Sequence, residues 1–162
     1  MKKALFAVLL ATAWPVAGQD VAREAYVIGV SAAMTGPGAS IYAPVVDAMK
    51  AYLDHVNAKG GVNGKQIQLI VQDDGAEPSR GAANAKKLLT QDKVVMLINT
   101  SLSSTYAPMI AEAKRANVPL YFGGSVCPKE TYPPADPLLF CSSAFGANLD
   151  SQGALAFVKS QA

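Results

Sequence analysis

The chain of 162 residues is poor in the residues and motifs that carry most enzyme chemistry. It has one histidine, His55, and only 16% of its residues are charged. The phosphate-binding patterns G-x-x-x-x-G-K-[ST] and G-x-G-x-x-G are absent, as is the nucleophile pattern G-x-S-x-G. A Ser-His-Asp arrangement has no base in place, because His55 lies within a predicted helix away from the serine-rich segment. We therefore expect no catalytic residue, no cofactor and no enzyme activity, and we expect His55 to be solvated.

Long hydrophobic runs and an excess of one charge are also missing beyond the first residues. Lys2 and Lys3, an apolar run over 4–13 and small residues up to Gly18 are typical of a secretory signal peptide, and the run is too short for a membrane span. Without these two lysines the 14 basic residues fall to 12, which equals the 12 acidic residues. A net charge near zero argues against nucleic acid or an anionic membrane as partner. We expect a signal peptide over 1–18 and a soluble exported protein.

Cysteine is scarce as well: the chain has only Cys127 and Cys141. After export both would lie in an oxidising compartment, where a disulfide is the leading interpretation and two buried thiols are the alternative. Neither lies near the cleavage region, which argues against a lipid anchor. No histidine or third cysteine lies close to them in sequence, so we expect no metal site.

The rest of the chain alternates between patterns of strands and of helices. Short runs rich in β-branched residues indicate strands, and apolar residues at helical spacing indicate helices between them. The predicted strands cover 26–33, 66–72, 94–98, 118–122 and 138–141, and the predicted helices cover 44–57, 78–90, 106–116 and 148–159. The first helix is expected to bury Val45, Met49, Tyr52, Leu53 and Val56. Right-handed crossovers turn this order into a doubly wound, mostly parallel α/β sheet, which binds ligands beyond the carboxyl ends of its strands.

Two polar segments follow neighbouring strands of this predicted sheet. The segment 99–105, NTSLSST, carries five hydroxyls directly before a helix, where hydroxyls and backbone N–H groups suit a carboxylate. An N-cap would account for only one of the five. Gly123-Gly124-Ser125 follows the next strand, where a plain turn is the alternative to a ligand contact. Because both loops lie at one edge of the sheet, we expect them to hold a carboxylate and an amino group together.

Two further features lie at the same edge. Asp73 and Asp74 end the second predicted strand. Paired acids at a strand end can bind a metal, but the loops after the other strands offer no acid in register. Turn formation and helix capping are the better interpretation. Tyr42, placed in the loop after the first strand, is the tyrosine that we expect near a ligand.

Several of these segments occur together, and in this order, in a known family. They are VIGVSAAMTGP, DHVNAKGGVNGKQIQLIVQDD, a helix with P-S-x-G-A-A-N-A-K-K-L, LINTSLSSTYAP and VPLYFGGS. From about Val27 onward the chain resembles the periplasmic substrate-binding proteins of ABC transporters of the branched-chain amino acid type, the leucine-binding-protein-like group. The resemblance implies a non-enzymatic type I periplasmic-binding-protein lobe, flavodoxin-like in fold, that closes with a second lobe on a small ligand.

The resemblance also implies a set of ligand-binding residues. By position, the hydroxyl segment would meet the carboxylate, and Gly123 and Ser125 would meet the amino group. The residues expected at the ligand are Tyr42, Ser101, Ser103, Ser104, Thr105, Gly123 and Ser125. Leu102 stands where a family hydroxyl is expected, so an amino acid, an aromatic acid, an amide and other carboxylates all remain candidate ligands.

Family members are longer than this chain. The resemblance therefore implies that residues 19–162 are a truncated, incomplete first lobe. It predicts a periplasmic solute-binding protein that captures a small carboxylate, an amino acid in the first place, for uptake through an ABC permease in the membrane. The alternative function is a ligand-sensing receptor domain of the same fold that acts on a regulatory partner.

Overall fold

A computed structural model describes residues 25–124, 126–142 and 155–161. The predicted signal peptide lies outside the described residues. The elements are β1 (Tyr26–Ala32), α1 (Ala39–Ala58), β2 (Ile67–Asp73), α2 (Pro78–Thr90), β3 (Met96–Thr100), the 3-10 turn η1 (Ser103–Thr105), α3 (Tyr106–Ala116), β4 (Leu120–Phe122), the 3-10 turn η2 (Lys129–Thr131) and β5 (Leu139–Cys141). Of the last predicted helix, residues 155–160 are helical, and 148–154 lie outside the described residues.

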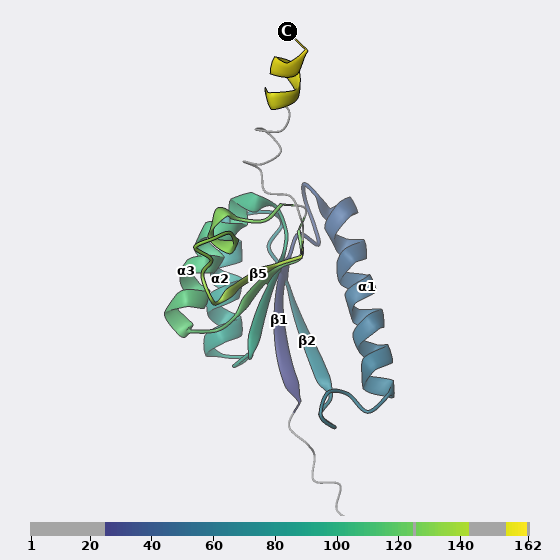
Figure 1. Ribbon diagram of the computed structural model, residues 1–162. Coiled ribbons are helices and arrows are strands. Elements are labelled where there is room, and N and C mark those ends of the chain that lie inside the picture. The colour runs from purple at the N-terminus through teal and green to yellow at the C-terminus, as the bar shows by residue number, and fades with distance from the viewer. Residues whose placement is uncertain (1–24, 125, 143–154, 162) are drawn as a thin grey trace, which may run out of the picture.

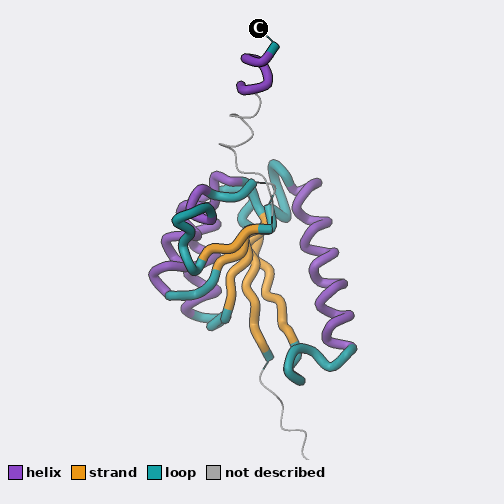
Figure 2. The backbone as a smooth tube through the Cα atoms, in the orientation of Figure 1, coloured by secondary structure: helices purple, strands orange, loops and turns teal. Residues whose placement is uncertain are grey.

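The five strands form one sheet in the order β2-β1-β3-β4-β5, and every pair of neighbours is parallel. The helix α1 covers one face of this sheet, and α2 and α3 cover the other (Figures 1 and 2). The prediction of a doubly wound, mostly parallel α/β sheet is thus confirmed. The wetter strand β2 lies at an edge of the sheet, as its alternating glutamines predict.

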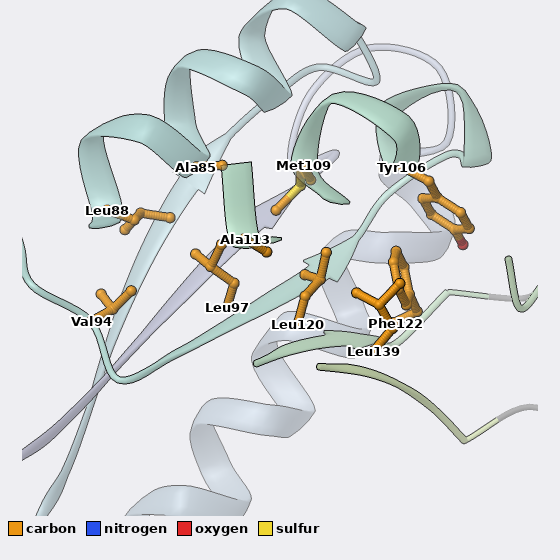
Figure 3. Packing of buried hydrophobic residues seen from close by; sticks show 10 residues of the cluster. All are labelled: Ala85, Leu88, Val94, Leu97, Tyr106, Met109, Ala113, Leu120, Phe122 and Leu139. Atoms are coloured by element: carbon orange, nitrogen blue, oxygen red, sulfur yellow. The ribbon is translucent and has the colours of Figure 1, made fainter. Parts of the chain in front are cut away.

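The main core lies between the sheet and the helices α2 and α3 (Figure 3). Leu97 of β3 pairs in register with Leu120 of β4, and both are fully buried with Phe122. From the helices, Leu88 and Met109 are also fully buried. Burying a side chain of this size contributes about 1.5–3 kcal/mol, so this layer dominates the stability of the fold.

The helix α1 differs from its prediction in both start and buried face. It begins at Ala39, five residues before the predicted start, directly after Gly38, whose φ of 88° a glycine adopts without strain. The buried residues are Tyr42 and Val46, whereas Val45 and Tyr52 are 38% and 67% exposed. The prediction of a buried Val45 and Tyr52 was wrong, because the inner face follows the helical spacing that begins at Tyr42 and continues through Val46, and Val45 and Tyr52 lie beside this face.

Candidate functional site

The carboxyl ends of β1, β3 and β4 lie side by side along the carboxyl-terminal edge of the sheet, across the strand direction (Figure 1). The strands β1 and β3 are neighbours in the sheet, but the helices that follow them lie on opposite faces, α1 on one and α3 on the other. Open α/β sheets bind ligands at such a switch point. We call residues 101–105, after β3, the hydroxyl loop, and residues 123–127, after β4, the glycine loop.

Two hydroxyls of the hydroxyl loop point into the protein. Ser101 Oγ donates a hydrogen bond to Asp74 Oδ1 at 2.7 Å. Thr105 Oγ1 donates to the carbonyl of Leu102 at 2.8 Å and accepts from Asn99 Nδ2 at 2.8 Å. Both residues are fully buried. These side chains, predicted to lie at the ligand, are therefore engaged by the protein itself.

The other two serines of the hydroxyl loop face the solvent. Ser103 and Ser104 are exposed and lie in η1, which leads directly into α3. Ser104 Oγ lies 3.5 Å from the carbonyl of Ala76, a distance that holds a hydroxyl only weakly. The first N–H groups of a helix lack acceptors within it. This pair of serines is thus the part of the hydroxyl loop that is free to meet an anion.

The glycine loop lies against the hydroxyl loop, as predicted. A Cβ at Gly124 would come within 2.6 Å of Tyr106 Oη and 3.2 Å of the carbonyl oxygen of Ser101. A Cβ at Gly123 would lie 3.2 Å from Thr100 Oγ1. Neither glycine has a positive φ, so these positions require small residues for space rather than for backbone conformation. Besides Gly123, the residue of this loop predicted to contact a ligand is Ser125, which lies outside the described residues.

Asp73 fastens the loop after β1. Its carboxylate accepts hydrogen bonds from the backbone N–H of Met34 at 3.0 Å and from Thr35 Oγ1 at 2.6 Å. It also accepts from the N–H of Gly75 and pairs with Arg80 Nη2 at 3.0 Å. Burial alone would raise the pKa of this carboxyl, but the donated hydrogen bonds outweigh it and hold the pKa well below its ordinary value.

Asp74, the next residue, is fully buried and accepts three hydrogen bonds, one of them from the N–H of Ala76 in its own turn. Turn formation by the two acids is therefore confirmed. Helix capping by them was wrong, because the N-cap of α2 is Glu77, which makes no side-chain hydrogen bond. Among the described residues, no group of His, Cys, Asp and Glu side chains could hold a metal ion.

Thr100 is a residue that sequence reasoning did not single out. It ends β3 and is fully buried, and its hydroxyl has no hydrogen-bond partner. In the part of the chain that the structure describes, the only other such side-chain atom is the hydroxyl of Tyr132. The alternation of side chains along β3, which places Thr100 on the face of Ile98 and opposite to Asn99, is the signal that separates it from its neighbours.

Two tyrosines pack behind the two loops. Tyr42 lies in the first turns of α1 rather than in the preceding loop, and it is only 5% exposed, packed with Ala33, Ala76 and Leu102. Its predicted place in a loop was wrong, because the helix starts early. Tyr106 Oη donates to the carbonyl of Val126 at 3.0 Å. Burial and the nearby phenol of Tyr42 raise the pKa of Tyr106 to about 12.

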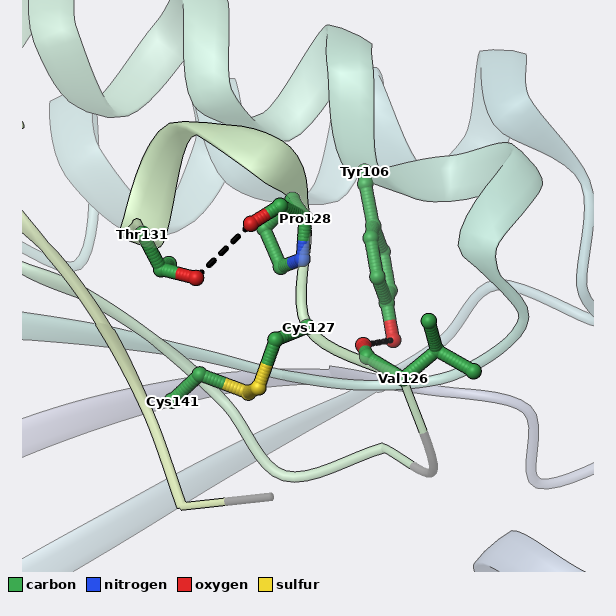
Figure 4. Close-up of a disulfide and its surroundings, with 6 residues drawn as sticks. All are labelled: Tyr106, Val126, Cys127, Pro128, Thr131 and Cys141. Carbon is green, nitrogen blue, oxygen red and sulfur yellow. Dashed lines mark hydrogen bonds between the residues drawn. A yellow bond between two sulfur atoms is a disulfide. The ribbon is translucent and has the colours of Figure 1, made fainter. Parts of the chain in front are cut away.

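The disulfide predicted between Cys127 and Cys141 is present (Figure 4). It joins the end of the glycine loop to the end of β5, with 5.8 Å between the Cα atoms. Figure 4 shows it beside the hydrogen bond from Tyr106 to Val126. The glycine loop is therefore fixed from two sides.

His55 is exposed, as predicted, and no described helix has the length and apolarity needed to cross a membrane.

Comparison with known proteins shows the family to which this fold belongs. Residues 25–161 match the family described as Periplasmic binding protein. An amino acid binding protein of Pseudomonas aeruginosa is 32% identical over 105 residues, which cover 65% of this chain and 28% of that protein. A Leu/Ile/Val-binding protein homolog of Brucella abortus is 37% identical over 90 residues, covering 55% of this chain and 24% of that protein.

The crystal structure of the branched-chain amino acid transporter substrate binding protein LivJ from Streptococcus pneumoniae, in complex with isoleucine, superposes with a TM-score of 0.69. It is 28% identical, and the match covers 76% of this chain and 34% of that one. The matches thus span about a quarter to a third of the length of these relatives. The family match extends over most of the chain, and the resemblance seen in the motifs is confirmed. The chain belongs to the periplasmic binding protein family, whose members are solute-binding proteins and not enzymes.

Proposed function

We propose that the chain supplies the carboxylate-binding part of a periplasmic protein that captures a small solute for an ABC permease. The single observation that carries this proposal is the exposed serine pair, Ser103 and Ser104, at the start of the η1–α3 helix. Their hydroxyls and the N–H groups of a helix start favour an anionic group. The adjacent glycine loop packs against the carbonyl of Ser101, and its backbone carbonyls would accept from an ammonium group on the same ligand.

The relatives support an amino acid as the first ligand to test. One is named an amino acid binding protein, and LivJ was crystallised with isoleucine. Leu102 interrupts the row of hydroxyls and packs against Tyr42, which leaves fewer donors than a fully hydroxylated loop would offer. An aromatic or aliphatic acid without an amino group is the second ligand class. In this proposal a second lobe closes over the bound ligand and buries it.

The test is a titration of the ¹⁵N-labelled chain with L-isoleucine, L-leucine and benzoate, followed by amide chemical shifts. At about 10 mM ligand even a site with a millimolar Kd is mostly filled. We expect the amides of Ser103, Ser104 and Gly124 to shift together with one saturation curve. The double variant Ser103→Ala, Ser104→Ala should weaken the response to the carboxylate.

Thr90→Ala provides the matched control, because Thr90 carries an exposed hydroxyl at the far end of α2. It should leave the titration unchanged. If none of the three acids shifts the amides of the serine pair, or if Thr90→Ala weakens the response as much as the serine double variant does, carboxylate binding at this edge is wrong.

A further inference from the structure

Asp74 ties together three strand ends at the candidate site. One carboxylate oxygen, Oδ2, accepts from Ser31 Oγ of β1 at 2.8 Å. The other, Oδ1, accepts from Ser101 Oγ of the hydroxyl loop at 2.7 Å and from the N–H of Ala76 at 2.8 Å. All three side chains, Asp74 included, are fully buried. A buried carboxylate is retained only when its oxygens are satisfied, and here both are.

The network continues from Ser101 into the helix start. The N–H of Ser101 donates to Asn99 Oδ1 at 3.1 Å, and Asn99 Nδ2 donates to Thr105 Oγ1 at 2.8 Å. Ser101 and Thr105 are thereby fixed at both ends of the hydroxyl loop. The exposed serines, Ser103 and Ser104, lie between these two fixed points.

The two serines that donate to Asp74 are held very differently by the backbone. Ser31 lies inside β1, in register with Gln72 of β2 on one side and Asn99 of β3 on the other. Ser101 follows the last paired residue of β3, Thr100, and so lies beyond the ladder. If residue 31 lost its hydroxyl, the sheet would still hold its backbone in place. If residue 101 lost its hydroxyl, the hydrogen bond from its backbone N–H to Asn99 Oδ1 would remain.

We propose that Asp74 is a positioning residue for the carboxylate site: through Ser101 it fixes the hydroxyl loop and thereby aims Ser103 and Ser104 at the ligand. This proposal rests on the proposed function for the identity of the ligand, but the positioning of the loop does not depend on it. Ser101, which the resemblance places near the ligand, acts in this arrangement through the loop and does not touch the ligand.

The test compares Ser101→Ala with Ser31→Ala in the whole chain. Both remove one hydroxyl donor from the same buried carboxylate. Ser31→Ala also removes the acceptor of Asn84 Nδ2 at 3.2 Å, so it should lower the melting temperature at least as much as Ser101→Ala. Only Ser101→Ala should speed hydrogen exchange of the Ser101 and Thr105 amides, which donate hydrogen bonds within the ligand-free loop, by about tenfold or more, as expected for a bond to a charged group. The same variant should weaken binding of L-isoleucine or benzoate about tenfold, whereas Ser31→Ala should change it less than about threefold.

Asp74→Asn provides a second variant with a predictable geometry. The N–H of Ala76 requires an acceptor at the Oδ1 position, so the amide oxygen must stay there and keep Ser101 as well. The amide nitrogen then faces Ser31, and only the bond to β1 is altered. Asp74→Asn should therefore resemble Ser31→Ala in exchange and affinity.

Each outcome decides the proposal. Equal effects of Ser101→Ala and Ser31→Ala on loop exchange would reduce Asp74 to a structural role and overturn it. Weaker binding by Ser101→Ala with unchanged loop exchange would show a direct contact between Ser101 and the ligand, which also overturns it. If the unmodified chain binds none of the acids, the proposed function fails, and the exchange measurement alone still decides whether Asp74 positions the loop.

Discussion

The hydroxyl loop and the glycine loop lie side by side at the same edge of the sheet but are held by different forces. Polar side chains fix the first, through Ser101 and Thr105, and the only charge among them is the buried Asp74. A disulfide, the hydrogen bond from Tyr106 to the carbonyl of Val126 and the hydrogen bond from the N–H of Gly123 to the carbonyl of Asn99 fix the described part of the second. The hydroxyl loop has more polar residues, but half of its hydroxyls bind other groups of the protein itself. The glycine loop has fewer polar residues and is fixed by neighbouring segments of the chain.

The contrast shows why serine and glycine content does not by itself define a ligand site. Ser101 and Ser103 are two residues apart, yet one is fully buried and the other exposed. The phenol oxygen of Tyr106 occupies the space that a side chain at Gly124 would need. In both loops, a residue that serves the packing of the protein itself is of the same amino-acid type as a residue that would contact a ligand.

Removing the disulfide should have the largest effect on stability. The double variant Cys127→Ala, Cys141→Ala opens a loop with a sequence separation of 14. In the chain-entropy model, a loop of this size contributes about 3 kcal/mol to the free energy of unfolding. Urea denaturation of the oxidised chain and of the variant measures the difference. Addition of a reductant should lower the stability of the unmodified chain and leave the variant unchanged.

Gly124→Ala should strain the contact between the two loops. The new Cβ would lie 2.6 Å from Tyr106 Oη, so either the loop or the ring has to move. Overpacking of this kind costs about 1–3 kcal/mol in the free energy of unfolding. Combining it with Tyr106→Phe removes the clashing oxygen and should recover part of the loss. If the losses of the two variants simply add, the phenol is not what requires a glycine at this position.

Tyr106→Phe alone should cost about 1 kcal/mol at neutral pH, because the bond to the carbonyl of Val126 is lost. It should also change the pH dependence of stability. The pKa of Tyr106 is raised from 10.0 to about 12 in the folded chain, so the unfolded chain loses this proton first. Stability is therefore fully present below about pH 10 and is lost as the pH rises toward about 12.

Denaturation across this pH range measures the effect. The slope should be smaller in Tyr106→Phe. Tyr52→Phe removes the hydroxyl of a tyrosine that is 67% exposed and controls for the loss of a tyrosine in general. An equal slope in the Tyr106→Phe variant and the unmodified chain would contradict the prediction.

Much of the fold followed from the sequence because the strands carry a strong local signal. Helix α2 begins at Pro78 and ends at Thr90, as the proline and the apolar spacing predict, and β2 lies at the sheet edge that its polar alternation indicates. Helix α1 was predicted less well. Pro44 suggested a start, but the helix begins directly after Gly38, and Pro44 lies inside it, where it lacks the N–H for one i→i−4 hydrogen bond.

The site was only partly predictable, for a reason that concerns distance along the chain. The loops, their adjacency and the disulfide follow from strand order and composition. The direction of the Ser101 hydroxyl does not, because it depends on a partner far away in sequence. Ser31 and Asp74 are 43 residues apart, and Asp74 and Ser101 are 27 residues apart. No local pattern marks such a network, and only the packed sheet brings its members together.

Thr100→Val should have the smallest effect and the opposite sign. Its hydroxyl is fully buried with no partner, so the folded chain bears a desolvation cost that valine does not have. The free energy of unfolding should rise by about 0.5–1 kcal/mol. Thr105→Val is the matched control, because Thr105 is equally buried but its hydroxyl makes two hydrogen bonds, and it should lose about 1–2 kcal/mol. Thermal denaturation of the two variants tests the difference in sign. If both variants lose stability alike, the hydroxyl of Thr100 has a partner in solution, such as a bound water beside Gly123.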